Sequence, residues 1–355
     1  MKTVFIFGAG ASKDGGAPLV DEFLDKARRL RVLQKVGDDA QAFDDVFKAI
    51  AQLRTVHDKS YLNLNNIEDL FAAIETGLLI RKFSNRNIEE IEQLRASIIK
   101  LITRTLEQSV KFPTQSGKLI PPSPYIDFIT ALDHLKASEP VTDRHSFVFI
   151  TFNYDLILDL SLTLAGYNYN YYLEDMLVTT QIPLLKLHGS VSWGACQKCK
   201  ATIVPFDMKR VSASPFSSTN ELIIPIIDYL AQTECPTCNQ LLVGPPVLVP
   251  PTWNKIEYQS HINNVWRKAA KELEQADNII TIGYSMPKMD AFFHYLYALG
   301  SESETKLQHF IVINPDKSVE GRFREIVGPG IDKQFQFVSG YFANSISYLS
   351  GVLGS

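Results

Sequence analysis

The stretch that decides the fold is residues 3–12, Thr-Val-Phe-Ile-Phe-Gly-Ala-Gly-Ala-Ser. A short apolar run that leads directly into glycines is typical of a buried parallel strand that turns into a helix. Glycines let the backbone approach a pyrophosphate closely, and the start of the helix offers free N–H groups and a partial positive charge. The stretch therefore predicts a dinucleotide site, although a tight glycine turn without a ligand is an alternative.

Similar apolar runs recur along the chain and predict the strands of one sheet. They are residues 147–150, 183–187, 279–282, 310–313 and 335–338. Helical patterns lie between them, for example Ile262, Val265, Trp266, Ala269 and Leu273 on one helix face. This alternation predicts an α/β fold, a doubly wound, Rossmann-like parallel sheet. The aromatic residues 167–172 are interpreted as an edge strand with paired rings.

Two segments interrupt the strand–helix alternation. Residues 35–140 are predicted to be a mainly helical insertion, with Asn66 as a helix cap and two apolar helix faces. These faces comprise Ile67, Leu70, Phe71, Ile74 and Leu78, and Ile91, Leu94, Ile98, Leu101 and Ile102. Residues 191–248 are predicted to be a small zinc-ribbon module with a proline-rich connecting loop. The Rossmann-like domain then comprises residues 1–34, 141–190 and 249–355.

Composition excludes several classes of protein. The 355 residues are 45% hydrophobic, enough for a large core, and carry a net charge of −4. No cationic excess is present to hold a phosphate backbone, so we expect no direct nucleic-acid binding. The sequence opens on a strand, and no apolar run reaches the roughly 18 residues of a membrane span. We therefore expect a cytoplasmic protein with no membrane contact.

The four cysteines form two pairs, Cys196 with Cys199 and Cys235 with Cys238. Two such pairs match the ligand spacing of a closed tetrahedral zinc site, which has a structural role because no position stays open for a substrate. The 35 residues between the pairs exceed the roughly 15 to 20 of common zinc ribbons, which predicts additional structure there. A cluster of metal-free thiols is the alternative.

Polar residues follow two of the predicted strands. Asn153 and Asp155 come after residues 147–150, and His188 comes after residues 183–187. Ligands of open α/β sheets bind at the carboxyl ends of the strands, so these side chains and the glycine loop are expected to converge. Taken singly, an Asn or Asp here is equally a turn or helix cap, and a lone histidine need not be catalytic. A hydride-transferring Rossmann enzyme is disfavoured, because Lys13 stands where its third glycine belongs.

The order of these motifs resembles the sirtuin superfamily over residues 3 to about 316. The loop of residues 8–12 is similar to the family's GAG-x-S phosphate loop, and residues 151–155, Thr-Phe-Asn-Tyr-Asp, to its T-Q-N-x-D. The paired cysteines occupy the place of the family's zinc ribbon. The resemblance implies NAD as substrate and structural Zn²⁺. It implies that NAD is held by Gly8, Ala9, Gly10, Ser12, Gly283, Ser285 and Asn314.

The resemblance also implies cleavage of the nicotinamide–ribose bond by Asn153, Asp155 and His188. Such cleavage passes through an oxocarbenium-like state, for which the leaving carboxamide must be oriented and a nucleophile positioned. Asp155 is suited to accept from the carboxamide and Asn153 to orient a water or ribose hydroxyl. His188, with an ordinary pKa near 6.5, is suited to act as base.

Two features of the peptide-binding sirtuins are altered. Residues 18–21 read Pro-Leu-Val-Asp without the family's arginine, and residues 251–254 read Pro-Thr-Trp-Asn in place of its Phe-Gly-Glu element. Residues 283–290, which end in Asp290, and the helix start at residues 66–69 resemble the sirtuin-like NAD hydrolases of bacterial anti-phage systems. The leading hypothesis is therefore an NAD⁺ glycohydrolase that depletes NAD. The alternatives are an NAD-dependent protein deacylase and a non-catalytic NAD or ADP-ribose sensor.

An enzyme that destroys NAD must be restrained, which implies control by a regulatory partner from the same defence system or by homo-oligomerisation. The helical insertion is a candidate for those contacts, or equally for a lid over the nucleotide. The sequence leaves open the trigger, the oligomeric state, activity of the chain alone and the choice between NAD and NADP.

Overall fold

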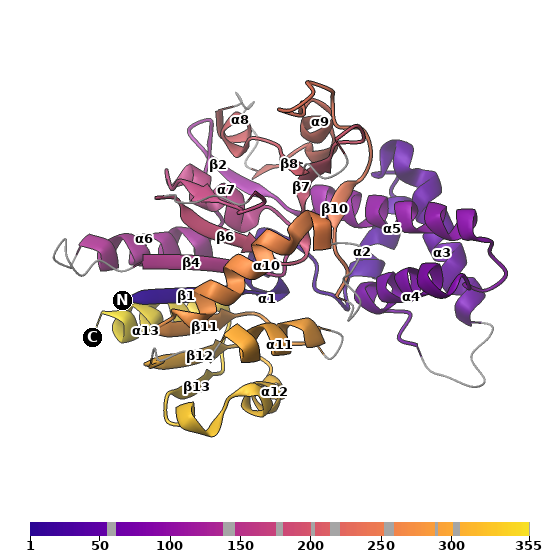
Figure 1. The fold of residues 1–355 in the computed structure, drawn as a ribbon. Helices are drawn as coiled ribbons and strands as arrows, with labels where there is room; N and C mark the ends of the chain where they lie inside the picture. The colour runs from indigo at the N-terminus through magenta and orange to yellow at the C-terminus, as the bar shows by residue number, and fades with distance from the viewer. Residues whose placement is uncertain are drawn as a thin grey trace.

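The structure, a computed structural model, describes nine stretches of the chain (Figure 1). They are residues 1–54, 62–137, 146–174, 180–199, 203–213, 221–251, 259–287, 290–300 and 306–354. The altered residues 252–254 noted above lie outside the described residues.

A seven-stranded parallel sheet forms the centre of the molecule, in the order β13-β12-β11-β1-β4-β6-β5. The strands are β1 (Lys2–Phe7), β4 (Ser146–Thr151), β5 (Tyr169–Asn170), β6 (Ile182–Lys186), β11 (Asn278–Ile282), β12 (His309–Ile313) and β13 (Phe335–Val338). All six predicted apolar strands are confirmed, within two residues at each end. The aromatic edge strand is confirmed as the short β5, with the rings of Tyr169 and Tyr171 5.3 Å apart.

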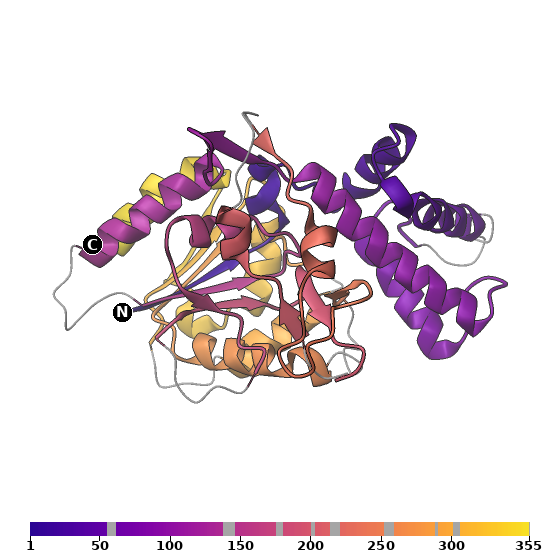
Figure 2. The same ribbon diagram turned by 90° about the horizontal axis from the view of Figure 1, so that it is seen from above.

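Helices cover both faces of the sheet, which confirms the doubly wound α/β class. On one face lie α6 (Ser123–Ala137) and α13 (Phe342–Leu353), side by side in Figure 2. Phe128 of α6 contacts the ring of Phe5 edge-on at 5.1 Å, as aromatic pairs in cores prefer. On the other face lie α10 (Gln259–Glu274) and α11 (Ala291–Gly300). The remaining helices near the sheet are α1 (Ala9–Ser12), α7 (Ile157–Leu164) and α12 (Val319–Ile326).

Four helices pack together at one side of the sheet: α2 (Phe23–Val32), α3 (Ala40–Arg54), α4 (Ile67–Ile80) and α5 (Ile88–Ser109). We call them the helical module. The predicted cap is confirmed, because the Asn66 side chain accepts from the N–H groups of Glu68 and Asp69. The apolar faces predicted for α4 and α5 are buried, except that Leu78 is half-buried. The hairpin β2 (Phe112–Gln115) and β3 (Lys118–Leu119) follows α5, and β9 (Glu221–Leu222) pairs with β2.

A three-stranded antiparallel sheet carries the cysteines. It consists of β10 (Pro246–Leu248), β7 (Gly189–Ala195) and β8 (Ile203–Pro205). The additional structure predicted between the cysteine pairs is confirmed by α8 (Met208–Ala213) and α9 (Ile226–Ala231). Glu107 of α5 accepts from the Ile227 N–H at 3.0 Å and so joins the helical module to α9. Among the described residues, every helix is too short or too polar to cross a membrane.

Candidate active site

The direction of the strand connections reverses between β1 and β11. From β1 the chain proceeds to β4 and β6 on one side, whereas β11, β12 and β13 extend the sheet on the other. Loops that leave two such neighbouring strands in opposite directions open a crevice at their carboxyl ends, where ligands of this fold class bind. Here the crevice lies between the loop after β1, which starts at Gly8, and the loop after β11, which starts at Gly283.

The glycines of these two loops are required by the contact between the loops themselves. The Gly8 N–H donates to the Ile282 carbonyl and the Gly10 N–H to the Gly283 carbonyl, both at 3.0 Å. Gly283 has a φ of +63°, and a Cβ atom added there would lie 2.4 Å from the Ala11 nitrogen. The glycines therefore have a structural role, as in the alternative of a tight turn without a ligand, and their contact with a phosphate stays a prediction.

Asn153 joins the loop after β4 to the glycine loop. Its Nδ2 donates to the Gly8 carbonyl at 2.9 Å and to the Ser12 Oγ at 3.0 Å. Its backbone N–H donates to the Thr151 hydroxyl at 3.1 Å, which holds the turn that presents the side chain. Three of the predicted site residues, 145 positions apart at most, are thus in direct contact.

Asp155 is a buried carboxyl group beside them. Its Oδ1 accepts from the Ile157 N–H at 2.9 Å, the arrangement of a residue that precedes a helix. Burial raises the pKa of Asp155, and the nearby Lys186 ammonium opposes part of that rise. The Lys186 Nζ donates to the backbone carbonyl of Asp155 at 2.6 Å and to the Asp159 carboxylate at 2.9 Å, and not to the Asp155 carboxyl group.

A pocket of about 570 Å³, counted with its open mouth, lies over this group. The glycine loop contributes Ala9 and the loop after β4 contributes Asn153 and Asp155, while the helical module supplies the opposite wall. That wall includes Phe23, Ile67, Glu68, Phe71, Ile102 and Leu106, and Val20 from the segment before α2 adjoins it. Their sequence pattern indicates no site role, because an apolar helix face has the same pattern whether it meets a core or a pocket. Glu68 contributes a second carboxyl group to the pocket.

His188 is buried next to the pocket and does not line it. Its ring lies 5.2 Å from that of Phe152 and 6.2 Å from that of Tyr154, and both of these residues line the pocket. Its Nε2 lies 3.5 Å from the Asp290 Oδ1. In the sequence, Asp290 stands out only as part of a resemblance, and nothing in its spacing indicates that it meets His188.

Ser285 and Asn314 lie at the carboxyl ends of β11 and β12, as their positions predict, and outside this pocket. The Asn314 Nδ2 donates to the Tyr284 carbonyl at 3.3 Å, and its Oδ1 accepts from the Asp316 N–H at 3.0 Å. The Ser285 carbonyl accepts from Arg322 at 2.8 Å. Their contact with a nucleotide stays a prediction.

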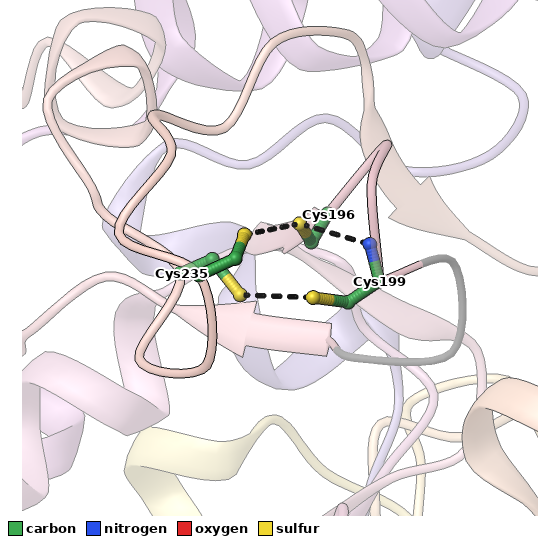
Figure 3. A group of neighbouring side chains, drawn as sticks. Cys196, Cys199 and Cys235 are labelled. Carbon is green, nitrogen blue, oxygen red and sulfur yellow. Dashed lines mark hydrogen bonds between the residues drawn. The ribbon is translucent and has the colours of Figure 1, made fainter.

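The four cysteine Sγ atoms all lie within 4.8 Å of one another. Cys196 and Cys238 are 3.5 Å apart and Cys199 and Cys235 3.9 Å, and the side chains converge in Figure 3. Tetrahedral zinc with Zn–S bonds of about 2.3 Å separates its sulfurs by about 3.8 Å. The cluster therefore fits a Zn²⁺ ion with four thiolate ligands, and such a closed set leaves no position for a substrate.

No protein-family model matches the chain, and no curated protein sequence matches it significantly. Among solved structures the chain is similar to a serine-to-alanine variant of a Sir2 homologue in complex with ADP-ribose, with 15% identity over 99% of this chain and 92% of that one and a TM-score of 0.46. It is similar to a Sir2 homologue in complex with NAD (14%, 99% and 89%, TM-score 0.44). It is also similar to Sir2 bound to an acetylated peptide (13%, 99% and 93%, TM-score 0.41). Similarity at this level assigns neither a ligand nor an activity to this chain.

Proposed function

We propose that this protein is a sirtuin-like NAD⁺ glycohydrolase that cleaves the nicotinamide–ribose bond to give nicotinamide and ADP-ribose. The observation that carries the proposal is the double hydrogen bond from the Asn153 amide to Gly8 and Ser12. It joins the phosphate-loop candidate to the cleavage candidate at the crevice where dinucleotides bind in this class of sheet.

The residues divide the reaction between them. Because the Asn153 Nδ2 is held by the protein, its Oδ1 is the atom that orients a water or a ribose hydroxyl. Asp155 accepts from the carboxamide of the leaving nicotinamide. His188 takes the proton from the nucleophile, as a base whose ordinary pKa lies near neutral pH. The pocket wall keeps bulk water away from the oxocarbenium-like state.

We propose water as the acceptor of the ADP-ribosyl group because apolar side chains line one side of the pocket. Pro18 and Val20, from the stretch that lacks the family's arginine, lie there with the helical module. Apolar side chains from α4 and α5 thus occupy one side of the site. This favours a site closed around a nucleotide over a channel for an acyl-lysine peptide. It also favours the lid role of the helical insertion over a role in assembly.

The same proposal gives the protein a place in bacterial anti-phage defence, as an effector that depletes NAD when infection is sensed. Its activity is then held in check by a regulatory partner or by self-assembly. The zinc ion is assigned a structural role only, because the four thiolates close its coordination sphere.

The test is NAD consumption by the purified protein, alone and with the products of neighbouring genes. We expect nicotinamide and ADP-ribose in equal amounts, and turnover should fall at least about 100-fold in His188→Ala. His134→Ala, an exposed histidine on α6, is the matched control and should retain activity. Nicotinamide release only with an acyl-lysine peptide would identify a deacylase. Nucleotide binding without turnover in every state would identify a sensor.

A further inference from the structure

Asp290 is a buried carboxylate placed between His188 and Tyr284. It is 2% exposed, and its Oδ2 accepts from the Tyr284 hydroxyl at 2.7 Å. Its Oδ1 lies 3.5 Å from the Nε2 of His188, which is 4% exposed. A buried carboxylate is costly unless polar groups face it, and here both oxygens face one.

An aromatic cluster fixes this arrangement. Phe152 stacks on Tyr284 with ring centroids 4.1 Å apart and an angle of 6°, and it meets the His188 ring edge-on. Phe293, which is fully buried, packs edge-on against both Phe152 and Tyr284. Since the histidine and the tyrosine contact the same phenylalanine, neither ring can turn away from Asp290 without disturbing the other.

A carboxylate at Nε2 determines which ring nitrogen is the base. It favours the tautomer with hydrogen on Nε2, so that the lone pair lies on Nδ1, and it stabilises the imidazolium that forms when Nδ1 takes a proton. The separation of 3.5 Å is slightly longer than a hydrogen bond, as is common before a substrate tightens a catalytic site.

We propose that Asp290 is a positioning residue for His188, which makes Nδ1 the basic nitrogen of the site. The inference rests on the proposed function. The proton lost by the attacking water goes to Nδ1, the water oxygen bonds to the anomeric carbon as nicotinamide leaves, and Asp290 stays ionised. Tyr284 assists by holding the second carboxylate oxygen.

The first measurement is the tautomer of His188 in the wild-type protein. Long-range ¹H–¹⁵N correlation spectra, with the ring signals assigned by their loss in His188→Gln, report which nitrogen carries hydrogen. We expect the Nε2–H form in the wild type. Asp290→Asn should shift the equilibrium toward the Nδ1–H form, because its amide can donate to Nε2. An Nδ1–H form in the wild type would overturn the proposal, whether or not the protein consumes NAD.

The second measurement separates positioning from a structural role. In Asp290→Asn we expect kcat for NAD cleavage to fall about 100-fold, whereas KM and the dissociation constant for ADP-ribose stay within about threefold. Tyr284→Phe keeps the contact at Oδ1 and should lose only about tenfold in kcat. Asp332→Asn, the same change at an exposed position, is the control. An Asp290→Asn enzyme with kcat within about twofold of the wild type would refute the positioning role.

Discussion

The crevice and the cysteine cluster differ in how far apart their residues lie in the sequence. In the crevice, Gly8 and Asn153 are in contact although they are 145 positions apart. In the cysteine cluster, only two residues separate the members of each pair. The cluster could therefore be predicted from spacing alone, while the crevice exists only once the strands have their order in the sheet. The two regions also differ in what they leave for a ligand. The four cysteine side chains form a closed set that fits one ion, whereas Asn153 and Asp155 line an open pocket.

The two regions are joined physically by one strand. β7 begins at Gly189, directly after His188, and ends directly before Cys196. We infer that the metal cluster anchors one end of the strand whose other end sets the backbone position of His188. Mutations should nevertheless separate the two regions, because we propose a structural role for the cysteine cluster and a catalytic role for the crevice.

The largest effect is expected from Cys235→Ser. The side chain is fully buried, and its loss removes one of four zinc ligands. Bound zinc should be lost and the free energy of unfolding should fall by more than about 4 kcal/mol, as is typical when a structural metal is lost. Metal analysis and chemical denaturation measure this. Lys198→Ser, at an exposed position between Cys196 and Cys199, is the control. Equal stability with and without a chelator would contradict a structural metal.

Asn153→Ala should lower the activity and leave zinc binding and stability largely unchanged. It removes the hydrogen bonds to Gly8 and Ser12, so NAD cleavage should fall about 100-fold, or about 3 kcal/mol in activation free energy. Zinc content should stay complete and the melting temperature should change little. Asn344→Ala, at an exposed position of α13, is the matched control. If zinc and activity were lost together, the two regions would not be separable in this way.

Gly283→Ala tests the contact between the two loops of the crevice. The added Cβ would meet the Ala11 nitrogen at 2.4 Å, so the loops must separate at a cost of about 1–3 kcal/mol. Gly117→Ala is the matched control, since it also has a positive φ but nothing lies within 4 Å of the added atom. Thermal unfolding and NAD affinity should change more in the first variant. Equal shifts in both would show that backbone strain alone is responsible.

The smallest effect on stability is expected from Asp155→Asn, and it depends on pH. Burial raises the pKa of Asp155 in the folded protein, so the folded state binds this proton more tightly than the unfolded state and loses stability as pH rises. The Asn variant should therefore be slightly more stable than the wild type at pH 7 and lose this advantage below the ordinary value of 3.8. Denaturation at both pH values measures this. A variant that is less stable at pH 7 would indicate that the charge is stabilised by its surroundings.

The sheet strands and the main helix faces were predictable because each follows a local pattern. Apolar runs identified β1, β4, β6, β11, β12 and β13, and the spacing of apolar side chains identified α4 and α5. The zinc ligands were predictable for the same reason. The division into domains stays a prediction, although α6, which falls in the predicted insertion, packs on the sheet.

Contacts made only by the tertiary structure were not predictable. Phe71 and Glu68 follow a helix pattern, and nothing in that pattern distinguishes a pocket wall from a core. The contact between Asp290 and His188 forms only because the folded chain brings together the segment after β6 and the segment before α11. β10 lies in a proline-rich stretch that was interpreted as a loop, because prolines give it a weak strand propensity. The strand forms because it pairs with β7.

The central position of β1 has a consequence for synthesis. β1 is translated before all other strands, yet its two neighbours in the sheet begin at residues 146 and 278. Until the ribosome has added Ile282 and Gly283, the Gly8 and Gly10 N–H groups lack their partners and the crevice has one wall. For an enzyme proposed to destroy NAD, a chain that is interrupted before these residues would lack one wall of its catalytic crevice.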